Sequence, residues 1–209
     1  MKLRISPTRI ALLNLKRRLV IARRGHKLLK DKLEGLLQVF MPIVEQYGML
    51  RLRVDRELPT AIRYFIIASA TSSERAVEMA LEETETKLAI DMGMKNIMSV
   101  QVPELTLKGF EISNTYSTIA TTMDFDRASE KLREVVPLLL NLANLEESII
   151  RLAQEIEKTR RRVNALEYVL IPAIKETVKA ISSKLEETDR SDRARLMKVK
   201  DMLAMGEMS

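Results

Sequence analysis

The most distinctive side chains of this sequence are basic ones that gather in short runs. They are Lys16, Arg17, Arg18, Arg23, Arg24 and Lys27 near the N-terminus and Arg160, Arg161 and Arg162 in the C-terminal third. Guanidinium groups bind phosphates and carboxylates through paired hydrogen bonds. Three interpretations are open: phosphate binding through charge alone, a basic collar that orients an acidic ring of a partner protein, or a solvated charged surface.

Most other site chemistry is excluded by composition. Cysteine is absent, and His26 is the single histidine. Disulfides, thiolate chemistry and histidine-based zinc sites are therefore excluded, and a Ser-His-Asp triad is hard to build. The six glycines are scattered and form no GxxxxGK or GxGxxG loop that would cradle a nucleotide phosphate. We expect no catalytic residues, no cofactor and no metal in this chain.

Regularly spaced apolar residues predict a long helix that carries the first basic runs. They recur in steps of three and four at Leu12, Leu15, Leu19, Ala22, Leu29, Leu33, Leu36, Phe40, Ile43, Tyr47, Leu50 and Val54. This is the 3.5-residue repeat of a coiled-coil seam. His26 fills the one gap, so we expect it to hydrogen-bond across the helix pair, with pH sensing as the alternative. Ser6, Pro7 and Thr8 predict the start of the helix.

A second seam occupies the C-terminal third. Its positions are Val135, Leu138, Leu142, Leu145, Ile149, Leu152, Ile156, Thr159, Val163, Leu166, Leu170, Ile174, Val178, Ile181 and Leu185. The last steps include two successive fours, a stutter that locally unwinds a supercoil. Pro42, Pro137 and Pro172 lie in or near the two patterns and predict bends, unless Pro137 lies in the first turn of its helix. The arginine runs interleave with the seams, which argues against the basic region of a leucine-zipper DNA-binding protein.

The middle of the chain has a different composition and predicts the turn between the two helices. Residues 73–91 predict a shorter helix with Ser73 as its cap. Alternating apolar residues at 98–102 and on both sides of Lys108 and Gly109 predict a small β-hairpin around a glycine-containing turn. The Ser- and Thr-rich residues 113–122 predict an edge strand or a loop.

These elements predict a fold dominated by α-helix: a long antiparallel two-helix coiled coil with a short helix and a small β-hairpin in the middle. We divide one elongated unit into residues 1–69, 70–125 and 126–209, the last ending in a Met-rich tail. Helices of this length, roughly 75 to 110 Å, do not fit a compact domain whose radius of gyration would be about 17 Å. No apolar run is long enough to span a bilayer and no secretory signal is present, so we expect a cytoplasmic location.

Gly25 stands inside the first basic helix, where glycine costs about 1 kcal/mol relative to alanine. Either a partner's backbone approaches closely there, or the long helix simply tolerates the glycine.

Stretches near both ends of this sequence resemble one family. The segments SPTRIALLNLKRRL at residues 6–19, ARRGHKLLKDK at 22–32 and TRRRVNALEYVLIP at 159–172 resemble the D subunit of the V-type and archaeal A-type ATP synthases. They stand in that family's order, near the two ends of the chain. The middle is similar to the family in character more than in wording.

The resemblance implies a role that composition does not reveal. In that family the D subunit is the central rotor axle, whose coiled coil enters a hexameric ring of A and B subunits. Its other end couples, with the F subunit, to the membrane ring through a socket-like subunit called C or d. The resemblance implies no catalytic residue in the axle, no nucleic acid, no membrane span of its own, and a location peripheral to the membrane.

Within this role, we expect Arg17, Arg18, Arg23, Arg24, Arg160, Arg161 and Arg162 to make guiding contacts with the ring. The competing hypothesis is a stand-alone coiled-coil scaffold or a basic nucleic-acid-binding protein. The sequence leaves open whether the coupled ion is H⁺ or Na⁺ and whether the complex mainly makes or consumes ATP.

Overall fold

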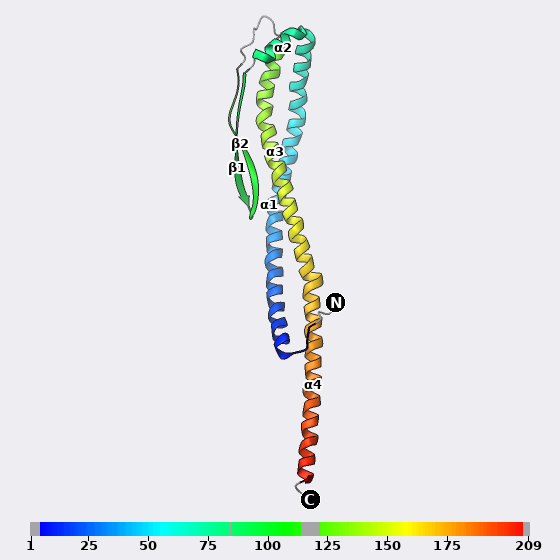
Figure 1. Cartoon of the computed structure of the whole chain (residues 1–209). Helices are drawn as coiled ribbons and strands as arrows, with labels where there is room; N and C mark the ends of the chain where they lie inside the picture. The colour runs from blue at the N-terminus through cyan, green and yellow to red at the C-terminus, as the bar shows by residue number, and fades with distance from the viewer. Residues whose placement is uncertain (1–4, 84, 114–121, 207–209) are drawn as a thin grey trace. The chain divides into compact units, whose positions relative to one another are not determined.

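Three long helical segments dominate the computed structural model, which describes residues 5–83, 85–113 and 122–206. Helix α1 spans Arg9–Thr71, α3 spans Met123–Asn164, and a π-helical segment, η1 (Ala165–Leu170), leads into α4 (Ile171–Gly206) (Figure 1). Between α1 and α3 lie the short helix α2 (Glu74–Glu83) and the strands β1 (Glu85–Ile97) and β2 (Val100–Ser113). The predicted fold class is confirmed.

The start of α1 also follows the prediction. The Thr8 hydroxyl accepts a hydrogen bond from the Ala11 backbone N–H at 3.1 Å. This bond satisfies one of the N–H groups that lack a partner in the first turn of a helix. Pro7 directly precedes this cap.

The apolar repeat of α1 is its buried side. Every predicted seam position from Leu12 to Val54, including His26, is buried or half-buried. Leu36 has no exposed surface, whereas its neighbour Leu37 remains 41% exposed. In α3 the second seam is buried in the same way, with Val135 and Leu152 both at 0% exposure. The 3.5-residue repeat therefore identified the packing face of both helices correctly.

The chain divides into two compact units, and each has its own antiparallel pairing. The terminal unit comprises Met1–Glu34 and Glu157–Ser209. Here Leu15 of α1 packs with Ile174 and Ile181 of α4, flanked by Leu12, Leu19, Val178 and Leu185. Arg9, at the start of α1, forms an ion pair with Asp189 at 2.9 Å. Because low numbers on α1 meet high numbers on α4, the two helices run antiparallel.

The central unit comprises Gly35–Ile156 and includes the C-terminal end of α1. Ala68 of α1, Ala80 of α2 and Phe125 of α3 form its small buried cluster, with the Phe65 and Phe125 rings 6.3 Å apart. Lys131 lies 3.8 Å from Glu57 of α1 and 2.7 Å from Glu134 of its own helix. Its hydrogen bond to Glu134 raises the pKa of Lys131 above its ordinary value.

The prolines have unequal consequences. Helix α1 continues through Pro42, and α3 through Pro137. Pro172 instead follows η1, where the Ile171 backbone N–H bonds to the Leu166 carbonyl, five residues back. A proline clashes with the carbonyl four residues earlier, and a widened π turn relieves that clash. The same widening places Leu170 at 40% exposure, so its assignment to the seam was wrong.

The predicted helix over 73–91 was too long. Ser73 does cap α2, because its hydroxyl accepts the Ala76 N–H at 3.3 Å. However, α2 ends at Glu83, and residues from Glu85 onward form β1. Residues from Lys87 to Asp91 each pair with a residue of β2, and this pairing outweighs the helical spacing. Of the Ser- and Thr-rich stretch, Ser113 ends β2, and residues 114–121 lie outside the described chain.

The hairpin turns at Met98 and Ser99, not at Lys108 and Gly109 as the sequence predicted. Ile97 pairs with Val100, and both turn residues have positive φ, 50° and 68°. This is the backbone of a two-residue type I′ turn, which normally favours glycine or asparagine. The Asn96 side chain supports it by accepting the Ser99 N–H at 2.9 Å. Without glycine, the sequence carries no strong signal for this turn.

Gly109 marks a bulge instead of a turn. Ala89 pairs with Gly109, but the next pair is Ile90 with Leu107, which leaves Lys108 as the extra residue. A bulge shifts the alternation of side chains along one strand by one residue. Phe110 therefore shares a face of the hairpin with Leu107.

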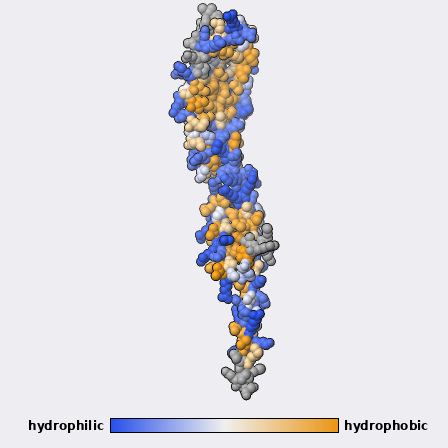
Figure 2. Space-filling view, viewed as in Figure 1, coloured by the Kyte–Doolittle hydropathy of each residue, from blue (hydrophilic) through white to orange (hydrophobic). Residues whose placement is uncertain are grey.

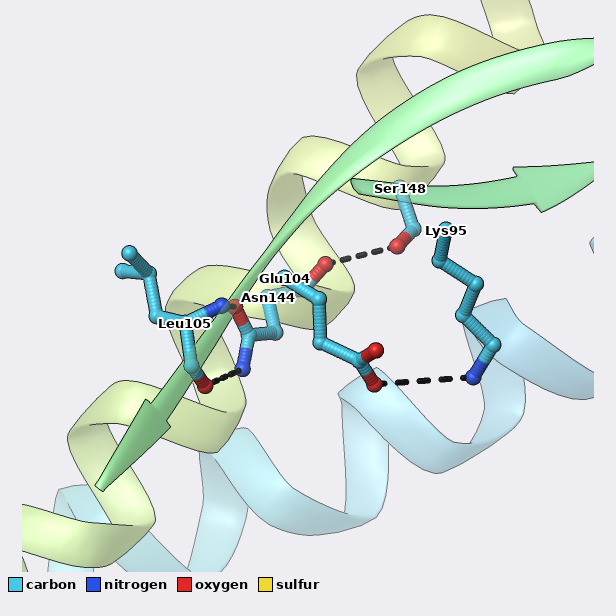
Figure 3. A network of polar contacts seen from close by, with 5 residues as sticks. All are labelled: Lys95, Glu104, Leu105, Asn144 and Ser148. Atoms are coloured by element: carbon cyan, nitrogen blue, oxygen red, sulfur yellow. Dashed lines mark hydrogen bonds and ion pairs between the residues drawn. The ribbon is translucent and has the colours of Figure 1, made fainter. Parts of the chain in front are cut away.

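The hairpin is attached to α3 by an asparagine (Figure 3). The Asn144 side chain accepts the Leu105 backbone N–H and donates to the Leu105 carbonyl, both at 2.8 Å. The Ser148 hydroxyl donates to the Asn144 carbonyl at 2.7 Å. At the tip of the hairpin, the methyl carbon of Met98 lies only 2.7 Å from where a Cβ on Gly35 would stand. The Met98 side chain at the tip thus lies against α1 at Gly35 and would have to shift if position 35 carried a Cβ.

Replacing Asn144 with leucine should loosen the hairpin. Asn144→Leu leaves the half-buried N–H and carbonyl of Leu105 without partners, at a cost of about 1–2 kcal/mol. Urea unfolding of the full chain measures this loss. Asn141→Leu, one helical turn earlier on α3 and exposed, is the matched control and should change the free energy of unfolding little. Equal losses in both variants would argue against the clamp.

Candidate functional site

All seven predicted contact arginines belong to the terminal unit, and all are exposed. Four project from α1 and three from the last turns of α3. Arg17 and Arg24 are seven residues apart, two helical turns, so they share one face of α1. That face lies two positions beyond the seam residues Leu15 and Ala22, about 200° around the helix, and points away from the helix pair.

A contact between His26 and Glu167, across the paired helices, separates the seven arginines into two groups. The His26 Nε2 lies 3.3 Å from the Glu167 carboxylate of η1, which confirms the predicted hydrogen bond of His26 across the helix pair. Because the helices are antiparallel, the arginines of α1 lie on one side of the His26–Glu167 contact and those of α3 lie on the other. Arg17 is nine residues from His26, about 14 Å along the helix. The arginines therefore form an extended basic strip in place of a narrow ring.

Arg161 is the one member of this strip with an assigned partner among the described residues. Its guanidinium forms a hydrogen bond and ion pair with Glu157, one helical turn earlier, and this bond raises the pKa of Arg161. Over residues 5–83, 85–113 and 122–206, none of the other six has a carboxylate within ion-pair distance. Six positive charges are thus available for an acidic surface of another protein.

Apolar side chains lie among these charges. A groove of about 360 Å³ is lined by Leu15, Arg18, Ile21, Leu170 and Ile174. Ile21, Leu28, Tyr168 and Val169 are each at least 60% exposed. The hydropathy surface shows such an apolar area in the terminal unit (Figure 2). An exposed mixture of arginine and apolar side chains is typical of a surface that binds another protein.

Sequence reasoning missed the apolar part of this surface. The predicted seam continues to Leu170, yet the π segment leaves Tyr168, Val169 and Leu170 exposed. The available signal was Pro172 together with the three successive steps of four from Leu166 to Val178. A proline combined with a stutter indicates where a helix leaves its regular repeat.

Gly25 has open space around it, since a Cβ there would meet nothing within 4 Å, and the same holds at Gly48. Gly25→Ala and Gly48→Ala should each stabilise the chain by up to about 1 kcal/mol. Gly35→Ala should gain less, because Met98 must move. Thermal unfolding ranks the three variants. If Gly25→Ala stabilises the isolated chain yet weakens assembly, a partner's backbone approaches there; equal gains at all three sites would contradict this geometry.

The fold defines a coiled-coil protein, and its exposed mixture of arginine and apolar side chains is of the kind found on protein-binding surfaces. A family model for the D subunit of ATP synthase matches residues 11–201. The chain is 47% identical over 205 residues to the V-type ATP synthase D subunit of Fusobacterium nucleatum, covering 97% of each chain. It is 47% identical to the protein of that name from Acetivibrio thermocellus, covering 96% of this chain and 92% of the relative.

A third relative, the D subunit of the V-type ATP synthase of Clostridium novyi, is 45% identical over 207 residues, covering 97% of this chain and 96% of the relative. The chain belongs to the ATP synthase D subunit family and is a stalk subunit of a rotary V-type ATP synthase. No helix within the described residues is both long and apolar enough to cross a membrane.

Proposed function

We propose that this chain is the central rotor shaft of the complex, and that it transmits torque between a ring of A and B subunits and the membrane ring. In this role it carries no catalytic site, and ATP is bound by the ring. The F subunit and a socket-like subunit on the membrane ring (C or d) are its partners at the other end. The proposal rests on the nearly full-length match to the family, combined with two long helices paired antiparallel.

The terminal unit is the part proposed to contact the ring. Beyond Asp189, which pairs with the first residue of α1, helix α4 continues to Gly206. All residues from Arg190 to Met202 are exposed. Over these 13 residues, roughly 20 Å of helix, no other helix of the described residues packs against α4. Leu196, Met197, Val199 and Met202 are at least 46% exposed along it and supply apolar contacts.

An asymmetric shaft suits a ring with three equivalent sites. Each face of the shaft presents different side chains, and the difference in contact energy biases the neighbouring site toward one conformation. Shifting one site from 1:99 to 99:1 takes about 5.5 kcal/mol, which several contacts of the basic strip and the apolar surface can supply together. Flexible arginine and methionine side chains also allow those contacts to be released as the shaft turns.

Native mass spectrometry of the full chain with its cognate A and B subunits tests the proposal. One copy of the chain per hexamer of three A and three B subunits is expected. The same measurement on the chain alone, and a titration with DNA at two salt concentrations, distinguish the alternatives. No binding to the ring, together with a homo-oligomer or salt-dependent DNA binding, would favour a scaffold or nucleic-acid-binding protein instead.

A further inference from the structure

Strand β1 is the outer strand of the hairpin. All ten residues from Lys87 to Asn96 are exposed, whereas β2 holds Val102 at 2% exposure and is bonded to α3 through Leu105. Figure 1 shows the hairpin alongside α3, and the surface of the central unit exposes apolar residues in that part (Figure 2). One strand of the pair thus packs on the helices and the other is left outside.

The backbone of β1 has hydrogen-bonding groups that point outward. In an antiparallel pair, two opposite residues exchange both hydrogen bonds or neither. The Leu105 N–H donates to Asn144 and the Leu105 carbonyl accepts from Asn144, so both groups point away from β1. The opposite residue, Met92, therefore forms no hydrogen bonds with β2 either. By alternation the same holds for Met94, opposite Pro103, and for Ile90, opposite Leu107. Within the described chain, no hydrogen bond is assigned to these outward groups.

The two edges of the hairpin are therefore unlike. The β2 edge is closed by the amide of Asn144, and Pro103 has no N–H to offer there. The β1 edge keeps its outward N–H and carbonyl groups at Ile90, Met92 and Met94. Natural proteins usually protect a long exposed strand edge, because it is a template for pairing with another strand. Among the described residues, nothing covers the β1 edge from Ile90 to Met94, so this part of the edge can accept another strand.

The side chains beside this edge determine what could bind. Leu88, Ile90, Met92 and Met94 share one face and are 47%, 43%, 71% and 64% exposed. On the opposite face, Asp91 pairs with Lys108 at 2.8 Å and Lys95 with Glu104 at 3.6 Å. Because these charges are matched within the hairpin, a strand added to β1 needs no charge of its own. An apolar, uncharged segment fits best.

We propose that β1 is a strand-addition site, filled in the assembled ATP synthase by an extended, uncharged and mainly apolar segment of another subunit. Main-chain hydrogen bonds to Ile90, Met92 and Met94 supply affinity, and the apolar face supplies selectivity. A second copy of this chain fits less well. Full antiparallel overlap of two β1 strands places Asp91 opposite Asp91 and Lys87 opposite Lys95, and like charges at such positions are destabilising. The site goes beyond the proposed shaft role and depends only on assembly into the complex.

Hydrogen exchange resolved to single amides tests the site in the unmodified protein. In the isolated chain, the amides of Ile90, Met92 and Met94 should exchange fast, while those of Asp91 and Gly93, bonded to β2, exchange slowly. In the purified complex, the three outward amides should slow by about tenfold or more. Unchanged exchange of these three amides would overturn the proposal. Slowing that grows with concentration of the isolated chain would assign the edge to a second copy, which also overturns it.

A proline variant tests the backbone contact directly. Met92→Pro removes one outward N–H and no ladder bond, and Met92→Leu keeps that N–H as the matched control. In the complex, Met92→Pro should return the amides of Ile90 and Met94 to fast exchange, while Met92→Leu keeps them slow. Continued slow exchange in Met92→Pro would contradict strand addition. If the amides of Asp91 and Gly93 also exchange fast in Met92→Pro, the substitution has disrupted the hairpin itself. The test is then repeated with Met94→Pro, which lies opposite Pro103. The stoichiometry from native mass spectrometry tests the shaft role separately.

Discussion

Replacing Arg17 and Arg24 together by glutamate should weaken binding of the chain to the A and B ring by on the order of 100-fold. Both guanidinium groups are exposed on one face of α1, and no carboxylate of the described residues neutralises them. If they meet acidic groups of the ring, the reversal turns two attractions into two repulsions. The loss should be largest at low salt, since exposed charges are screened as ionic strength rises.

The measurement is a titration of the reconstituted ring with the variant chain, at two salt concentrations, with ATP turnover read in parallel. Arg53→Glu is the matched control, because Arg53 is an exposed arginine of the same helix in the central unit. Its reversal should leave ring binding within about threefold of the original. Unchanged binding and turnover in the Arg17 and Arg24 double variant would remove the basic strip from the proposed function.

Replacing Leu36 by alanine should cost about 2–5 kcal/mol of the free energy of unfolding. Leu36 is completely buried on the seam, and truncating such a side chain loses its transfer free energy and leaves a cavity. Leu37→Ala is the control within the same turn of α1. It has the same change in volume and in helix propensity, but Leu37 is 41% exposed, so the loss should stay below about 1 kcal/mol.

Urea unfolding followed by far-ultraviolet circular dichroism measures both variants. The midpoint should fall clearly for Leu36→Ala and little for Leu37→Ala. Similar losses in the two variants would mean that the 3.5-residue repeat does not mark the side of α1 that stabilises the fold.

The repeat carried the prediction of the long helices because each seam residue contributes independently to the same pattern. The pattern has twelve apolar positions and His26, so a change at any one of them leaves it recognisable. The hairpin turn had no such redundancy. Two residues decide it, Met98 and Ser99, and neither is of the type that normally adopts positive φ. Gly109 is the residue type expected in a turn, but it lies beside the β-bulge instead.

The candidate surface was predictable in its charge and not in its apolar part. Runs of arginine can be read directly from the sequence, and long charged side chains on a helix remain exposed almost regardless of packing. The exposure of Tyr168 and Leu170 depends on η1, which changes the helical period for six residues. Glu167 could not be chosen in advance as the partner of His26, because the choice depends on the register between two helices 141 residues apart in sequence.

By itself, the sequence determined the helical class, the buried face of each long helix, the caps at Thr8 and Ser73, and the family. These depend on local spacing and local hydrogen bonds, which are written in consecutive residues. The tertiary structure alone decided the β1 and β2 register, the clamp from Asn144 to Leu105 and the open edge of β1. The physical reason is that backbone N–H and carbonyl groups are the same in every residue, so their partners are fixed only when distant segments meet.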